Sequence, residues 1–173
     1  MDIRAKRSRD KIIDTFLKIR AKKKLEKITV TEICKSAQIN KSTFYAHFHD
    51  VYDLSDFLET QLVEEILRSI TYPENLFTNK KSYVVELAKE STKRRDMIEI
   101  VFADEKYFSL AKRLMDAYKD YYFKKHPYLK DDPDTNIRLT YSVYGGFYAY
   151  YENLRFGSDK VVEVISNIGS ELS

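Results

Sequence analysis

The sequence predicts an all-α fold, and three observations support that prediction. Apolar residues, 43% of the chain, recur at intervals of three and four along most of its length, which is the spacing of one helix face. The 173 residues include four glycines and three prolines, so few positions break a helix. No segment alternates apolar and polar residues for long enough to predict a strand.

Charge is divided unevenly along the chain. Residues 1–49 contain 13 Lys and Arg against 5 Asp and Glu, a net charge of +8, whereas residues 50–173 carry a net charge of −5. We therefore expect two domains, residues 1–50 and residues 51–173, of which the first meets a polyanion. Taken alone, the lysine run 22–24 is also consistent with solvated surface.

The first domain is expected to be a three-helix bundle. A flexible basic arm, residues 1–7, precedes a helix over residues 9–21 with Ser8 as its cap. Thr29 and Glu32 have the spacing of a capping box, which predicts a second helix over residues 30–37. Asn40 is expected to cap a third helix, residues 41–48, and Asp50 to cap the helix that follows it.

The second and third of these helices, joined by a tight turn, are typical of a helix-turn-helix, although a generic corner between two helices has the same pattern. Phe44 and Phe48 lie four apart and are expected to point inward. Lys41 and Ser42 are then expected to reach base edges in a major groove. Tyr45 is expected to contact a phosphate or a thymine methyl.

Four further residues are candidates for contacts with the DNA backbone. Thr43 and His47 belong to the third helix. Thr29 and Thr31 stand at the start of the second helix, where free N–H groups and the helix dipole favour a phosphate. Thr29 can serve as a cap at the same time.

The stretch from Ile28 to Leu54 resembles the N-terminal signature of the tetracycline-repressor (TetR) family of bacterial transcriptional regulators. The resemblance implies a cytoplasmic homodimer that binds a double-stranded DNA operator and is released by a small-molecule effector, with the last two helices forming the dimer interface. It departs from the family at Gln38, where a turn glycine is usual, and at Val51, where a phosphate-binding lysine is usual. The matching positions are Thr29, Ile33, Ala37, Ile39, Lys41, Thr43, Phe44, Tyr45, Phe48 and Leu54.

The second domain is expected to consist of helices that regulate and dimerise. The first two are expected over residues 51–71 and 83–102, the latter with a break at 93–95. A third is expected to start at Asp104 and to end before Pro127. A fourth is expected from a cap at Asp134 to Gly157, and a last one from Ser158. The helix before Gly157 is apolar nearly all round, so we expect burial on two of its sides.

Tyrosines are frequent in this second domain, and two interpretations stay open. Hydroxyl-bearing aromatics can line a cavity for a flat or cationic ligand. They are equally common in a tyrosine-rich core and dimer interface. The candidate ligand-binding residues are Tyr118, Tyr122, Tyr144 and Tyr148.

Other classes of function find little support. The chain has no Gly-rich phosphate loop, nucleophile elbow or HExxH motif, and His47 and His49 lie on different helix faces. We therefore expect no enzyme activity, no metal site and no cofactor. The single cysteine, Cys34, excludes an internal disulfide and is most simply a core residue.

Localisation and function follow from these patterns. The chain has no apolar run that would span a bilayer, and residues 1–11 lack a signal-peptide core, so we expect a cytoplasmic protein that is not in a membrane. We expect a DNA-binding transcriptional regulator, most simply a ligand-released repressor on a pseudo-palindromic operator. The alternative is a DNA-bound adaptor or architectural protein whose second domain binds a protein partner.

Overall fold

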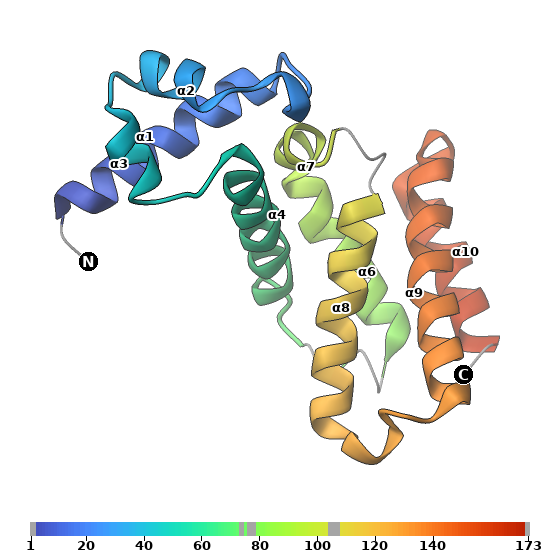
Figure 1. Ribbon diagram of the computed structural model, residues 1–173. Coiled ribbons are helices and arrows are strands. Elements are labelled where there is room, and N and C mark those ends of the chain that lie inside the picture. The colour runs from blue at the N-terminus through green and yellow to red at the C-terminus, as the bar shows by residue number, and fades with distance from the viewer. Residues whose placement is uncertain (1–2, 73–74, 76–78, 104–107, 172–173) are drawn as a thin grey trace. The chain divides into compact units, whose positions relative to one another are not determined.

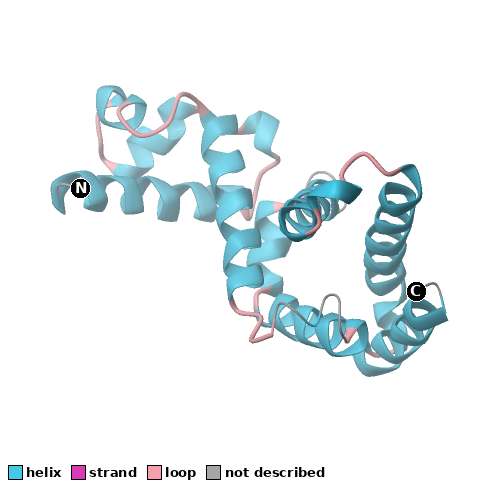
Figure 2. Ribbon diagram, turned by 90° about the horizontal axis from the view of Figure 1, so that it is seen from below, coloured by secondary structure: helices cyan, strands magenta, loops and turns pink. Residues whose placement is uncertain are grey.

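A computed structural model describes residues 3–72, 75, 79–103 and 108–171 (Figure 1). Every regular element in these ranges is a helix and none is a strand (Figure 2), which confirms the all-α prediction. No helix in the described part of the chain combines the length and the apolar character needed to cross a bilayer.

The chain divides into two compact units. The N-terminal unit comprises residues 1–62 and 96–107, and the C-terminal unit comprises residues 63–95 and 108–173. Helix α4 (Val51–Arg68) begins in the first unit and ends in the second. The chain re-enters the N-terminal unit in α7 (Arg95–Val101).

Three helices and a short 3-10 turn build the N-terminal unit ahead of α4. They are α1 (Ile3–Arg20), η1 (Leu25–Lys27), α2 (Val30–Ala37) and α3 (Lys41–Tyr45), and α1, α2 and α3 contact one another. Burial of their apolar faces is the main stabilising contribution. The buried side chains of these elements and of the start of α4 include Ile12, Phe16, Ile33, Cys34, Ala37, Phe44, Phe48, Val51 and Leu54.

Helices α1 and α4 each have one boundary that differs from the one expected. The predicted flexible arm is wrong for residues 3–7, because α1 begins at Ile3 and Ser8 lies inside it, with its hydroxyl donating to the Ala5 carbonyl at 2.9 Å. Helix α4 ends at Arg68, earlier than expected. There the Ser69 hydroxyl and N–H both donate to the Glu65 carbonyl, at 2.7 and 3.2 Å, and so close the last turn.

The described residues of the C-terminal unit form four further long helices. They are α6 (Lys80–Lys93), α8 (Phe108–Lys125), α9 (Pro133–Asn153) and α10 (Ser158–Glu171), with 3-10 turns at Pro127–Leu129 and Leu154–Phe156. Helix α10 packs against α6 and α9, and α8 packs against α9 (Figure 1). Their core residues include Leu110, Ala111, Leu114, Met115, Leu139, Phe147, Val161 and Val162.

The caps of α9 correct one prediction and support another. The N-cap is Asp132 rather than Asp134, because Pro133 occupies the first helical position and the Asp132 carboxylate accepts from Thr135 N–H at 2.8 Å. Hydrogen bonding from Thr135 holds the pKa of the Asp132 carboxyl below its usual range. Gly157 adopts a φ of 90° after η3, a conformation that glycine takes without strain.

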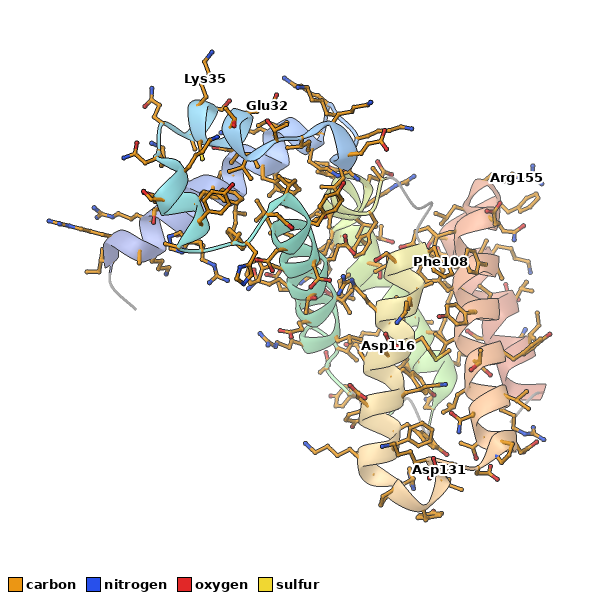
Figure 3. All side chains as sticks on the ribbon, in the orientation of Figure 1. Glu32, Lys35, Phe108, Asp116, Asp131 and Arg155 are labelled. Atoms are coloured by element: carbon orange, nitrogen blue, oxygen red, sulfur yellow. The ribbon has the colours of Figure 1, made fainter. Side chains whose placement is uncertain are left out.

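The expected break at residues 93–95 is confirmed, since Arg94 separates α6 from α7. The helix start expected at Asp104 lies outside the described residues. Helix α8 is described from Phe108. The side chain of Phe108, labelled in Figure 3, is 53% exposed.

Within the C-terminal unit, α6 holds the segment that follows α4. Glu86 Oε1 accepts from Thr71 N–H at 2.8 Å. About two turns further on, Arg94, the residue that follows α6, donates to the Glu90 carboxylate at 2.9 Å and to Ser69 Oγ at 2.7 Å. Glu86 directly, and Glu90 through Arg94, therefore hold the chain just beyond α4.

Within the single chain, helix α9 is buried on one side and open on another. The burial expected on its second side, in a dimer interface, stays a prediction. Leu139 and Phe147 are buried, whereas Ile137 is 67% exposed and Tyr141 65% exposed. These two lie four residues apart and share a face. The chain itself leaves an apolar strip of α9 uncovered.

Candidate nucleic-acid interface

The start of α2 carries the first pair of candidate residues. Thr29 is the N-cap, and its hydroxyl accepts from Glu32 N–H at 3.2 Å, as the capping-box spacing predicts. The Glu32 carboxylate, expected to return the bond to Thr29, accepts instead from Lys23 Nζ at 2.6 Å. Thr29 and Thr31 are both exposed, so their hydroxyls lie at the surface beside the N–H groups of the first turn.

The turn between α2 and α3 forms without a glycine because Gln38 takes the left-handed conformation itself, with φ 51° and ψ 52°. Two backbone bonds close the end of α2, from Ile39 N–H to the Cys34 carbonyl at 3.0 Å and from Gln38 N–H to the Lys35 carbonyl at 3.3 Å. This pair of bonds is a Schellman motif. The left-handed conformation costs a non-glycine residue about 1–2 kcal/mol, which the two bonds offset.

Helix α3 is shorter than predicted and ends at Tyr45 rather than at Phe48. The helical hydrogen-bond ladder breaks at His47, whose N–H donates to the Phe44 carbonyl three residues back, at 2.9 Å. The next cap begins directly after this break, where Asp50 Oδ1 accepts from Asp53 N–H and Asp53 Oδ2 accepts from His49 N–H, each at 2.8 Å. The His49 N–H is therefore bound to α4 and does not extend α3. At the other end Asn40 holds the N-cap position, but its side chain makes no cap hydrogen bond there.

The two faces of α3 separate as the sequence predicts. Phe44 is fully buried and Phe48 is 4% exposed, and their ring centroids lie 6.0 Å apart. Lys41 and Ser42 are exposed, and Tyr45 is 54% exposed with its ring edge-on to Phe44 at 5.7 Å. Packing of Phe44 and Phe48 fixes the orientation of α3. The face with Lys41, Ser42 and Tyr45 is therefore directed away from the core.

His47 and Thr43 are less accessible than the other candidates, and each is half-buried. His47 Nε2 lies 2.7 Å from Ser8 Oγ on α1. With the hydroxyl proton of Ser8 directed at the Ala5 carbonyl, as its geometry allows, the tautomer of His47 that fits is the one in which Nε2–H donates to Ser8 Oγ. His47 therefore makes a contact that joins the segment after α3 to α1, which sequence reasoning did not foresee.

Val51 replaces the lysine expected from the resemblance, and it is 5% exposed at the first position of α4. Its side chain belongs to the apolar interior. Cys34 is likewise buried as a free thiol, and burial raises its pKa. A neutral thiol in an apolar setting is unreactive, which agrees with the core role expected for it.

The four candidate tyrosines of the C-terminal unit have different surroundings. Tyr118 packs against the buried pair Ile70 and Tyr83, and burial raises its pKa to about 12. Tyr122 lies with its ring centroid 4.9 Å from that of His126. Tyr144 and Tyr148 are half-buried on α9.

A cavity of about 330 Å³ that opens to solvent lies on the C-terminal unit. Figure 3 labels two of its acidic residues, Asp116 and Asp131. None of the four candidate tyrosines lines it. Its lining residues are Asp116, Lys119, Asp120, Phe123, Lys130, Asp131 and Asn136. Among the residues that the structure describes, no group of three or more His, Cys, Asp and Glu side chains is arranged to hold a metal ion.

No protein-family model and no curated protein sequence matches this chain.

Proposed function

We propose that this chain is a sequence-specific DNA-binding transcriptional regulator of the tetracycline-repressor type. In this proposal α2 and α3 form a helix-turn-helix in a DNA-binding domain of residues 1–50, and residues 51–173 regulate and dimerise. The observation that carries the proposal is the separation on α3 between buried Phe44 and exposed Lys41, Ser42 and Tyr45. A lysine followed by a hydroxyl at the start of a helix suits the acceptors on guanine and neighbouring base edges.

Two recognition helices in a homodimer would read a pseudo-palindrome whose half-sites lie about one helical turn, or a multiple of it, apart. Selection of bound duplexes from random DNA tests this proposal directly. We expect enrichment of an inverted repeat. The proposal would be contradicted if no DNA sequence were enriched and the protein bound no duplex at low salt.

The proposed mode of regulation is release by a small ligand. Helix α4 starts just after the helix-turn-helix and ends where Glu86 and Arg94 hold the chain on α6, so a ligand in the C-terminal unit can act on the DNA-binding end through α4. Aromatic and cationic compounds suit the tyrosines of that unit. A compound that stabilises the protein in a thermal-shift screen should also lower its affinity for the operator. A stabilising compound that leaves operator affinity unchanged would count against release.

One observation supports a second candidate, a DNA-bound adaptor that receives a protein partner. The strip containing Ile137 and Tyr141 is exposed in the single chain, and an uncovered apolar strip suits either a second copy or a different protein. Light scattering separates the two, since a dimer favours the first candidate. A monomer that captures a defined partner favours the second.

A further inference from the structure

The connector between α1 and α2 is a compact lysine-rich segment. Residues 21–28 include four lysines and one glutamate, and all five side chains are exposed. These lysines are Lys22, Lys23, Lys24 and Lys27. Four like charges within six residues repel one another, which raises the electrostatic free energy of the folded chain unless an anion is near.

The connector is not a loose loop, because its backbone is held at several points. Lys22 N–H donates to the Ile19 carbonyl, Lys27 N–H to the Lys24 carbonyl and Ile28 N–H to the Leu25 carbonyl, each at 3.0 Å. Arg20, which is 4% exposed, donates from its guanidinium to the Lys23 carbonyl at 3.0 Å. The charged side chains therefore leave from an ordered backbone.

The connector also lies beside the start of α2. Lys23 Nζ contacts Glu32 Oε1 at 2.6 Å, and Glu32 is in the first turn of α2. That turn presents the exposed hydroxyls of Thr29 and Thr31. The fixed lysines thus extend a surface on which hydroxyl and N–H donors already favour an anion.

From this juxtaposition we propose that Lys22, Lys24 and Lys27 bind DNA phosphates next to those reached by the start of α2. The inference rests on the proposed DNA-binding function and adds phosphate contacts outside the helix-turn-helix. Because the backbone of the connector is already ordered, only the lysine side chains lose freedom on binding. These lysines would supply the positive charge that is missing at position 51, where Val51 stands in place of a phosphate-binding lysine. A lipid surface is a poorer fit, because Leu25 is half-buried and Ile28 buried, so the connector has no exposed large apolar side chain to insert.

The test compares the full chain with a triple variant, Lys22→Gln, Lys24→Gln and Lys27→Gln, leaving Lys23 with Glu32. A matched control carries Lys81→Gln, Lys89→Gln and Lys124→Gln, three exposed lysines of the C-terminal unit, so that net charge changes equally. Fluorescence anisotropy measures binding to the selected duplex and to a random duplex between about 50 and 200 mM salt. Circular dichroism checks that each variant keeps its fold.

We expect the triple variant to lose affinity by a similar factor for both duplexes, and its logarithmic salt slope to fall by about 2–3. The control should keep the wild-type slope. An unchanged slope in the triple variant, or an equal loss in the control, overturns the inference while leaving the proposed function intact. Wild-type chain that binds neither duplex overturns both. Loss of binding to phosphatidylserine vesicles with unchanged DNA binding would also overturn it.

Discussion

Ser8 Oγ lies 2.7 Å from His47 Nε2, and this hydrogen bond joins two segments 39 residues apart in the sequence. It ties the start of α1, with its exposed Arg4 and Arg7, to the residues that follow α3. Because Ser8 also donates to the Ala5 carbonyl, one hydroxyl serves both its own helix and its neighbour. The position of α3 is thereby coupled to α1.

Ser8→Ala should lower the free energy of unfolding by about 1 kcal/mol, since the half-buried His47 donor loses its acceptor. DNA affinity should fall as well, because α3 is held less firmly. Urea denaturation and anisotropy measure the two effects. Ser142→Ala, an exposed serine on α9, is the control and should change neither. A Ser8→Ala variant with unaltered stability would show that the bond contributes nothing.

Lys41→Ala should reduce binding to the selected duplex by about 1–3 kcal/mol and relax specificity at the base it reads. The fold should be unaffected because the side chain is exposed. Anisotropy on the selected duplex and on single-base variants measures the change. Lys89→Ala is a matched control on α6. Equal affinity for Lys41→Ala and wild type would refute the proposed orientation of α3.

The Asp132 cap predicts a pH dependence of stability. Its pKa is lowered in the folded state by the bonds from Thr135, so it stabilises the fold above the unfolded pKa of about 3.9, and the contribution is lost as pH falls through the folded value. Asp132→Asn keeps a capping side chain without the titrating group. Thermal melts from neutral to acid pH should show a smaller acid loss for Asp132→Asn. Asp131→Asn is the neighbouring control, and identical acid profiles for wild type and Asp132→Asn would contradict the assignment.

Ile137→Glu with Tyr141→Glu should convert the proposed homodimer to a monomer, because the charges would be buried against the second copy. Light scattering at micromolar concentration measures the mass. Tyr128→Glu removes an aromatic that is 77% exposed outside α9 and should leave the dimer intact. A double variant that still dimerises would place the interface elsewhere.

Local patterns in the sequence determined much of this fold. Periodicity predicted the helices, and nearest-neighbour chemistry predicted the Thr29 cap, the Asp50 cap and the break at Arg94, because each depends on residues within one turn. The inward pair Phe44 and Phe48 followed from their spacing. The exposure of Lys41, Ser42 and Tyr45 followed in turn, since a helix with one buried face presents the other.

Tertiary structure decided what distant residues do to one another. Sequence spacing does not reveal that His47 meets Ser8 or that Lys23 pairs with Glu32. It also did not reveal that Ile137 and Tyr141 stay uncovered, because burial depends on which helices pack together. The sequence determined the helices and their faces through contacts within a few residues, and only packing of the whole chain decided which faces and side chains meet.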